Sequence, residues 1–441
     1  MTSVINSISN YTGSMLASAR RLTRQFGPGL VTGADDDDPS GIATYSQAGA
    51  QFGYALGWTM FLTSPFMIAI QMVTARIGAV TGTGLAANLR KALPRATLQF
   101  MTGLLLVANT INIAADVAAM GDALRLVAGG PVLVYVTLFG AGSLAAEILV
   151  PYRRYSRYLK VLTLVLFAYV AAAFTVHVQW RDVLAATFVP RLSWDRDLAL
   201  MIVAIFGTTI SPYMFFWQAA LEAEERRLRR GGNVGDASAA SALRKRLPQR
   251  EEARIRVDTV SGMIYSNVIG FFIIVTTGET LHAHGITQIN TAEQAAEALR
   301  PLAGPLAFFL FAAGIVGTGL LAVPVLAGSA GYAVAETVGW RGSLEMPARG
   351  APGFYLIVAA ATIAGLIVAL TPLNPIRMLF WSAVVNGVVA VPLMAGMMLG
   401  AGDRKIMGAF AASRLLMTGG WAATALMAAA VAVMLIANFA G

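Results

Sequence analysis

Four consecutive aspartates, residues 35–38, interrupt an otherwise apolar stretch in the N-terminal part of the chain. The residues before them, 26–33, and after them, 42–72, are mostly apolar or small. A charged side chain at the centre of a bilayer costs roughly 2.5 kcal/mol or more on insertion scales. Pro39 and Gly41 follow at once and cannot continue a regular helix without losing hydrogen bonds. The pattern therefore predicts a broken membrane helix whose carboxylates bind a cation.

The four carboxylates are not expected to play equal parts. They cannot all be ionised side by side unless a cation lies among them, because like charges repel one another. Asp35 and Asp38 are three residues apart and can share one helical face, so we expect them to be the cation ligands. Asp36 and Asp37 are expected to point elsewhere or to hold protons. The alternative is a solvated loop, which the apolar flanks disfavour.

The composition is that of a polytopic membrane protein. The 441 residues are 57% hydrophobic and 12% charged, with a mean hydropathy of +0.66, whereas about a quarter of the residues in a soluble protein are charged. Cys is absent, which excludes disulfides, thiolate metal sites and covalent Cys catalysis. We find no phosphate-cradling loop and no nucleophile–base pair, so we expect neither an enzyme nor an ATP-driven pump, and no cofactor.

The elements that must position the aspartates are membrane spans, which are marked by apolar stretches of about 20 residues. We expect eleven, at residues 27–50, 53–78, 98–126, 131–150, 158–178, 197–220, 258–280, 302–335, 353–371, 375–399 and 416–438. Residues 1–25 lack the apolar segment of a signal peptide, so no cleaved leader is expected.

The cationic residues predict an orientation. With the N-terminus in the cytoplasm, 26 of the 32 Lys and Arg fall on the cytoplasmic side and six outside. Such an excess is typical of cytoplasmic loops and explains the net charge of +9 without nucleic acid as a partner. We expect an integral protein of the bacterial inner (plasma) membrane, with the N-terminus cytoplasmic and the C-terminus external. The oligomeric state stays open.

A second interruption lies in span 6, where polar residues at 207–211 precede Pro212. Breaks in spans 1 and 6 suggest two inverted repeats of five spans whose discontinuous helices meet at mid-membrane. The expected parts are a cytoplasmic segment at 1–26, spans 1–5 at 27–178, spans 6–10 at 197–399 and an added span at 416–438. The polar loop 222–256 is expected to be a helix extension with a flexible tether; a lipid-headgroup contact is the alternative.

Three short motifs resemble span 1 of the NRAMP divalent-metal transporters. They are Gly27-Pro28-Gly29, Asp38-Pro39-Ser40-Gly41 and Gln51-Phe52-Gly53-Tyr54. The span-6 segment from Gly207 to Tyr213 resembles that family's Gly-Ala-Thr-Val-Met-Pro-His in part. The resemblance implies an all-α, LeuT-like fold and alternating access, with spans 1, 2, 6 and 7 rocking against spans 3, 4, 8 and 9. It also implies proton-coupled uptake of Mn²⁺ or Fe²⁺.

The resemblance also implies a set of site residues, which departs from the family pattern. Family members hold the metal with the Asp and Asn of Asp-Pro-Gly-Asn, the Met of Met-Pro-His and nearby carbonyls. Here Asp38 matches the Asp, and Asp35 falls where the family offers a carbonyl. The other positions facing the metal are Ser40, Gly41, the Thr208 carbonyl, Ser211 in place of Met, and Tyr213 in place of His. Asp116 matches a carboxylate linked to proton movement, and we expect Asp37 to join it in an ion relay.

The ligand types favour a hard cation. Carboxylates and hydroxyls are hard donors, whereas the thioether that Ser211 replaces is soft and helps to select transition metals. The set predicts Mg²⁺ or Mn²⁺ as the substrate. Ordinary polar lining is the alternative for Ser40, Ser211 and Tyr213. Two other functions stay open: a carrier of a different solute, with the aspartates as a Na⁺/H⁺ or counter-charge site, and a sensor or channel.

Overall fold

The computed structural model describes residues 32–33, 36–152, 154, 163–190, 195–229, 249–408 and 411–439. Within these ranges the secondary structure is helical, without strands. Among the described residues, nine helices are long and apolar enough to cross a membrane, and a bent helix pair would make ten. The long elements are α4 (Gly57–Thr81), α6 (Arg95–Ala128), α7 (Val132–Leu149), α14 (Gln249–Thr280), α17 (Ala307–Val338), α18 (Pro352–Ala369), α19 (Pro375–Gly402) and α21 (Arg414–Phe439), together with α11 (Arg196–Thr209) followed by α12 (Pro212–Arg229).

Two of the eleven expected spans differ from the expectation. The first half of span 1 lies largely outside the described residues, so this span is represented by α3 (Pro39–Phe52). Span 5 was expected at 158–178. α9 (Phe167–Thr175) ends slightly earlier, and the chain turns by 115° into α10 (Trp180–Phe188), which lies beyond the expected span. Hydropathy along the chain does not report the angle between neighbouring helices, so it did not reveal this turn.

The break in span 1 includes Asp37 and Asp38, whereas the sequence suggested a break over residues 38–41. Asp37 and Asp38 are not helical, and α3 begins at Pro39, with Ser40 and Gly41 in its first turn. Proline suits this position because its missing N–H would have no partner in the first turn anyway, and its fixed φ is already helical. Pro39 and Gly41 therefore begin the second half of the span and do not form the break.

The break in span 6 is where the sequence predicts it. α11 ends at Thr209, Ile210 and Ser211 leave the helix, and α12 begins at Pro212. Both breaks are buried. α3, α11 and α12 form the interior of the molecule, and nearly every residue of α3 from Pro39 to Ala50 is buried.

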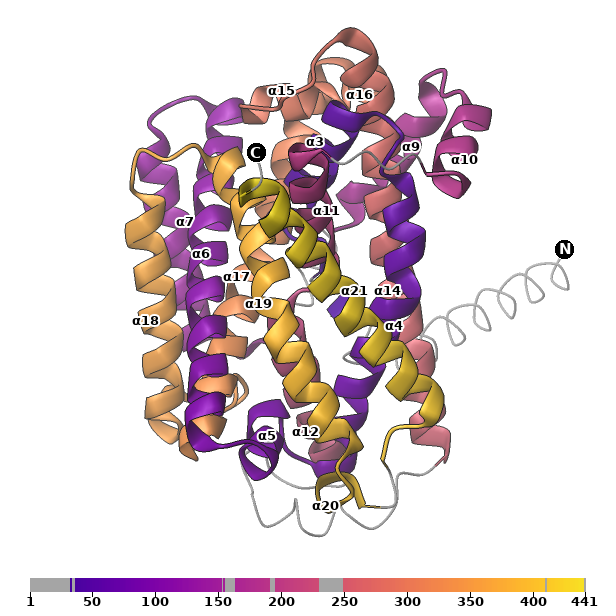
Figure 1. Cartoon of the computed structure of the whole chain (residues 1–441). Coiled ribbons are helices and arrows are strands. Elements are labelled where there is room, and N and C mark those ends of the chain that lie inside the picture. Colours follow the sequence, from indigo (N-terminus) through magenta and orange to yellow (C-terminus); the bar gives the residue numbers. More distant parts are fainter. Residues whose placement is uncertain are drawn as a thin grey trace, which may run out of the picture.

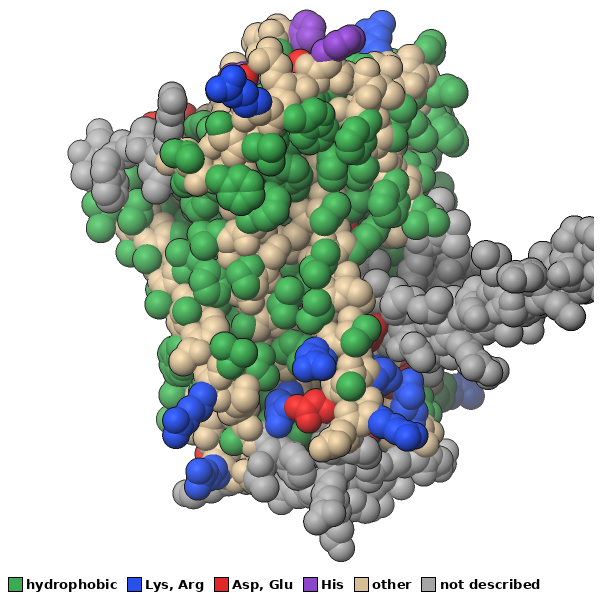
Figure 2. Space-filling model, turned by 90° about the vertical axis from the view of Figure 1, so that its right-hand side faces the viewer, with side chains coloured by type: hydrophobic (Ala, Val, Ile, Leu, Met, Phe, Trp, Pro, Cys, Tyr) green, Lys and Arg blue, Asp and Glu red, His purple; other side chains and the backbone are tan. Residues whose placement is uncertain are grey.

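The other helices enclose these three (Figure 1). α6, α7, α17 and α18 lie on one side, α4 and α14 on the other, and α19 and α21 cross the near face. Short helices mark the two ends: α5 (Leu85–Ala92) and α20 (Arg404–Met407) at one, and α15 (Ala292–Glu297) and α16 (Arg300–Ala303) at the other. Figure 2 shows most visible Lys and Arg side chains at the α5 end, with His side chains at the α16 end.

Candidate functional site

The Asp38 side chain lies between the two breaks and is 1% exposed. Its Oδ1 atom accepts hydrogen bonds from the Ser40 hydroxyl at 2.6 Å and from the Gly41 backbone N–H at 2.8 Å. This is the arrangement of an aspartate that caps a helix N-terminus. Oδ2 accepts a hydrogen bond from the Tyr213 hydroxyl at 3.3 Å. One carboxylate oxygen therefore holds α3 in place, while the other faces α12.

The Ser211 hydroxyl is turned toward its own helix. It lies within hydrogen-bond distance of the Thr208 carbonyl oxygen at 2.8 Å and of the Gly207 carbonyl oxygen at 3.0 Å. The expected Thr208 carbonyl ligand thus already accepts a hydrogen bond. The Ser211 oxygen keeps its lone pairs, so it can still accept a hydrogen bond or contact a cation.

The two broken helices approach one another at Gly41 and Thr208. A Cβ atom at Gly41 would lie 3.2 Å from the Thr208 Oγ1 atom and 3.5 Å from the Tyr45 ring. The Thr208 hydroxyl is buried and has no hydrogen-bond partner within the described ranges. Burying such a group without a partner is costly. The hydroxyl is therefore a polar group at the α3–α11 junction that a ligand could satisfy.

Asp36 and Asp37 face a different helix. The Ser266 hydroxyl on α14 lies 2.5 Å from Asp36 Oδ2 and 3.0 Å from Asp37 Oδ1. All three side chains are buried. The acidic run therefore divides into two parts, with Asp38 directed at α12 and the pair before it directed at α14, as the sequence suggests for Asp36 and Asp37.

Asp116 lies in the middle of α6, where its side chain is 0% exposed. Neither of its carboxylate oxygens has a hydrogen-bond partner among the residues that the structure describes. Asp116 lies on α6, which packs against α3, the helix that Asp38 caps. The structure thus places the expected relay residue near the candidate cation ligand, on a different helix.

The structure brings together most of the predicted set. Asp38, Ser40, Gly41 and Tyr213 are linked by hydrogen bonds, and Thr208 and Ser211 lie at the facing break. Asp35 lies outside the described residues. Within the ranges that are described, no three His, Asp or Glu side chains converge on a point where they could hold a metal ion. Among the residues that the structure describes, carboxylates alone do not complete a metal site, so hydroxyls, carbonyls, water or residues outside the described ranges would have to supply the other ligands.

Sequence reasoning missed two contacts. The first is Ser266, whose signal was the polar triplet Tyr265-Ser266-Asn267 inside apolar α14. The second is a reciprocal amide pair one turn from Asp116. Asn112 Nδ2 donates to Asn386 Oδ1 at 2.8 Å, and Asn386 Nδ2 donates to Asn112 Oδ1 at 3.2 Å. Both partners were visible as polar residues in apolar helices, but no pattern along the chain pairs them.

The sequence of the chain is similar to a known protein family and to several of its relatives. A family model described as natural resistance-associated macrophage protein-like (Nramp) matches residues 29–437. A divalent metal cation transporter MntH from Yersinia enterocolitica is 26% identical over 408 residues, which is 89% of either chain. The MntH of Deinococcus radiodurans is 25% identical over 415 residues, covering 91% of this chain and 87% of its own.

Solved structures agree on the fold. The manganese transporter of Eremococcus coleocola superposes with a TM-score of 0.69 at 17% identity, over 92% of this chain and 84% of its own. Mhp1, a nucleobase-cation-symport-1 family transporter, superposes with a TM-score of 0.54 at 12% identity, over 93% of this chain and 92% of its own. The LeuT-like architecture expected from the sequence is therefore confirmed.

Proposed function

The chain belongs to the Nramp family of divalent metal cation transporters, and on that premise we propose that its substrate binds where the breaks of spans 1 and 6 meet. Asp38 is the primary charged ligand, and Asp35 assists it. Ser40, Gly41, the Thr208 carbonyl, Ser211 and Tyr213 complete the surroundings. The observation that carries the proposal is the buried Asp38 carboxylate, which bridges α3 and the start of α12.

The cation is a hard one, Mg²⁺ or Mn²⁺. The support is chemical: the side chains of Asp38, Ser40, Thr208, Ser211 and Tyr213 offer carboxylate and hydroxyl oxygen. Such a set suits cations that prefer oxygen ligands and keep part of their water shell. Ser211 stands where the resemblance places a thioether, so the discrimination that a soft ligand gives against Mg²⁺ is lost.

Transport proceeds by alternating access, and Asp116 and Asp37 form the route of a coupling proton or ion. Asp116 supports this role because it is a buried carboxylate without a hydrogen-bond partner in the described part of the chain and lies near Asp38. Intramembrane carboxylates of this kind typically mark ion pathways. When a cation binds, the charge that it brings to Asp38 changes the field at Asp116, which couples the two sites.

The molecule lies in the bacterial inner membrane, with the α5 and α20 end in the cytoplasm. The support is the concentration of Lys and Arg at that end. On this orientation the N-terminal segment 1–26 and the loop 222–256 are cytoplasmic, and the C-terminus is external. Spans 1–5 at 27–178 and spans 6–10 at 197–399 form the two repeats, with 416–438 added.

The test is calorimetric titration of the purified protein with Mn²⁺, Mg²⁺ and Ca²⁺. The same titrations are made on Asp38→Ala and on Asp38→Asn, which keeps the side-chain shape but removes the charge. We expect saturable binding in the wild type and its loss, or a weakening of tenfold or more, in both variants, because an ionised ligand is removed. Uptake into proteoliposomes should fall in parallel. Unchanged binding in Asp38→Asn would contradict the assignment of the primary ligand.

A carrier of an organic solute, the other function considered from the sequence, is not favoured. The MntH relatives are divalent metal cation transporters by name. The resemblance to Mhp1 concerns the fold alone. Binding that needed an organic solute and ignored all three metal ions would restore this alternative.

A further inference from the structure

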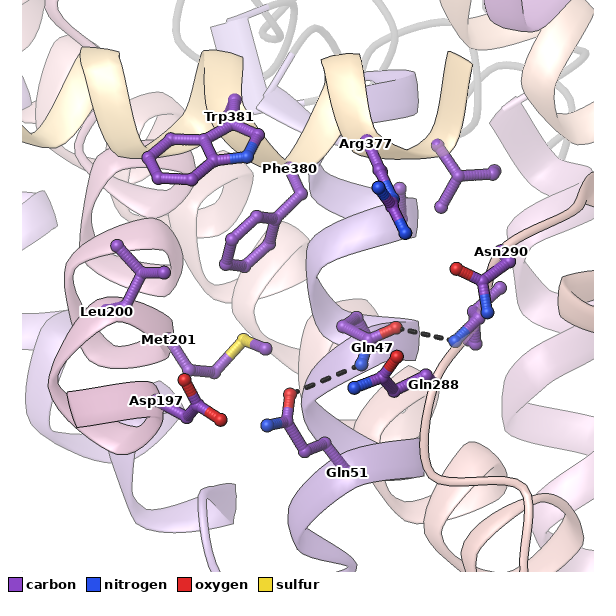
Figure 3. A pocket seen from close by; sticks show the side chains of 13 residues that line it. Gln47, Gln51, Asp197, Leu200, Met201, Gln288, Asn290, Arg377, Phe380 and Trp381 are labelled. Atoms are coloured by element: carbon purple, nitrogen blue, oxygen red, sulfur yellow. Dashed lines mark hydrogen bonds between the residues drawn. The ribbon is translucent and has the colours of Figure 1, made fainter. Parts of the chain in front are cut away.

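A pocket of about 260 Å³ opens at the end of the molecule that carries α15 and α16. Three helices and one loop line it: α3, the first turns of α11 and α19, and residues 288–290 (Figure 3). α3, α11 and α19 also pack against one another pairwise. The proposed orientation makes this pocket the external vestibule above the candidate cation site.

The pocket is aligned with that site along two helices. Gln51, Gln47 and Ala43 on α3 line the pocket at intervals of four residues, and the next step in the series is Pro39, directly after Asp38. Residues four apart lie on one face of a helix. On α11, Asp197 and Met201 line the pocket with the same spacing and lead toward Thr208. The distance from Ala43 to Pro39 along the axis is about 6 Å, or one turn.

One wall of the pocket is fixed by hydrogen bonds. Gln47 Oε1 accepts from the Ile289 backbone N–H at 2.8 Å, and its Nε2 donates to the Thr287 carbonyl oxygen and to Gln51 Oε1, both at 3.2 Å. Both the carbonyl oxygen and the amide nitrogen of the Gln47 side chain are thus hydrogen-bonded. The side chain holds the loop at residues 287–289 against α3. The side chains of Gln288 and Asn290, which also line the pocket, have no such contacts among the described residues and stay available.

Two opposite charges line the same pocket without pairing. Asp197 and Arg377 are both exposed, and neither forms an ion pair or a side-chain hydrogen bond with another described residue. Figure 3 shows Asp197 on α11 and Arg377 on α19 apart from one another across the pocket. Within the described ranges the Asp197 carboxylate thus has no direct partner, and it can attract a cation into the vestibule.

The size of the pocket suits a hydrated ion. Six waters occupy about 180 Å³ at their volume in the liquid, which fits within the 260 Å³ available. Mg²⁺ in particular gives up its water reluctantly and is often held by one or two carboxylates through its water shell. The amide oxygens of Gln288 and Asn290 can accept hydrogen bonds from coordinated water, and Asp197 supplies the negative charge.

We propose that this vestibule is a second cation site, where a hydrated divalent cation is held by Asp197, Gln288 and Asn290 before it reaches Asp38. The inference rests on the proposed function for the destination of the ion, but the site itself does not need Asp38. Arg377 opposes binding and keeps it weak. Conduction needs this balance, because an ion held too tightly at an outer site would not move on.

The experiment counts bound Mn²⁺ by electron paramagnetic resonance at low ionic strength on the purified full chain. We expect two Mn²⁺ per wild-type chain, one in Asp38→Ala, one in Asp197→Asn and none in the double variant. The weaker Mn²⁺ should be the one that Asp197→Asn removes. Matched controls are Asp195→Asn and Arg196→Gln, which change exposed neighbours outside the pocket lining and should leave both Mn²⁺ in place.

Transport gives a second readout. Asp197→Asn should raise the KM for Mn²⁺ about five- to tenfold at low salt, because one unit charge near a divalent ion is lost in a watery site. It should leave kcat unchanged. Arg377→Gln should lower the KM, and both effects should shrink at high salt, where exposed charges are screened.

The outcomes separate the two hypotheses. If Asp197→Asn leaves both the Mn²⁺ count and the KM unchanged, the vestibule site is wrong, whatever happens at Asp38. If Asp38→Ala loses no Mn²⁺ while Asp197→Asn loses one, the vestibule site stands and the assignment of Asp38 fails.

Discussion

The neighbours of each aspartate decide what that aspartate can do. Asp38 caps α3 and meets Tyr213, whereas Asp36 and Asp37 share the Ser266 hydroxyl. A run of identical residues thus has two environments, because the chain leaves the helix at Asp37 and turns successive side chains in different directions. The sequence predicted this division between Asp38 and the pair before it, but it did not reveal Ser266.

Exchanging two site residues tests the ligand alignment. In Gly41→Asn/Ser211→Met the site regains an amide and a thioether, and the Mn²⁺-to-Mg²⁺ affinity ratio should rise by tenfold or more, because soft ligands favour transition metals. An Asn side chain at residue 41 requires its neighbours to shift slightly, because a Cβ there would lie 3.2 Å from the Thr208 hydroxyl. Ser211→Met alone, which avoids this crowding, is the matched comparison. An unaltered ratio in both variants would mean that the alignment is wrong at the site.

Ser266→Ala should destabilise the protein. The substitution removes the hydroxyl that two buried carboxyl groups share, and leaving a buried polar group without its hydrogen bond costs about 1–3 kcal/mol. Thermal unfolding in detergent should show a lower Tm. Ser261→Ala is the control on the same helix, because in the described part of the chain the Ser261 hydroxyl bonds only to the Asp258 carbonyl oxygen. Equal Tm values for the two variants would argue against the Asp36–Asp37–Ser266 cluster.

At the scale of elements, the two broken spans are held by backbone packing as well as by side chains. A Cβ atom at Gly207 would overlap the backbone of Ala383 and Gly387, so α11 lies directly against α19. The same close approach brings Thr208 to the α3 junction. The sequence predicted the helix interruptions from their Gly and small residues. It did not predict which helix each interruption contacts.

Gly207→Ala should therefore be severely destabilising. The methyl group has no space, and overpacking a close helix contact typically costs about 1–3 kcal/mol. Gly103→Ala on α6 is the matched control, since nothing lies within 4 Å of the Cβ position there and Ala favours a helix over Gly. The yield and Tm of folded protein in detergent distinguish the two. A Gly207→Ala variant as stable as Gly103→Ala would contradict the contact.

At the scale of the whole molecule, hydropathy and charge were enough to find the architecture. Nine of the eleven expected spans correspond to helices in the described ranges that are long and apolar enough to cross a membrane, because lipid demands long apolar segments with satisfied backbones. The 115° turn between α9 and α10 escaped prediction because hydropathy along the chain carries no information on the angle between neighbouring helices. The sequence did not predict the contacts of Asp36 and Asp37 with Ser266, or that of Asn112 with Asn386, because these contacts depend on which helices pack together.

The absence of Cys allows a clean test of orientation. A single His284→Cys variant places a thiol at the α16 end, and Arg404→Cys places one at the α20 end. A membrane-impermeant thiol reagent applied to intact cells should label the first and spare the second until the cells are opened. The reverse pattern would invert the proposed topology.

The Asn112–Asn386 pair bears on how this sequence can change through evolution. Each amide satisfies the other in the interior, so α6 and α19 are joined by two mutual hydrogen bonds. Loss of Asn386 leaves the Asn112 carbonyl oxygen buried without a donor, although Asn112 Nδ2 keeps its bond to the Ala108 carbonyl oxygen at 2.9 Å. Replacement of both amides by apolar residues of similar shape can be nearly neutral. The two positions should thus be inherited as a unit, with relatives carrying both amides or neither.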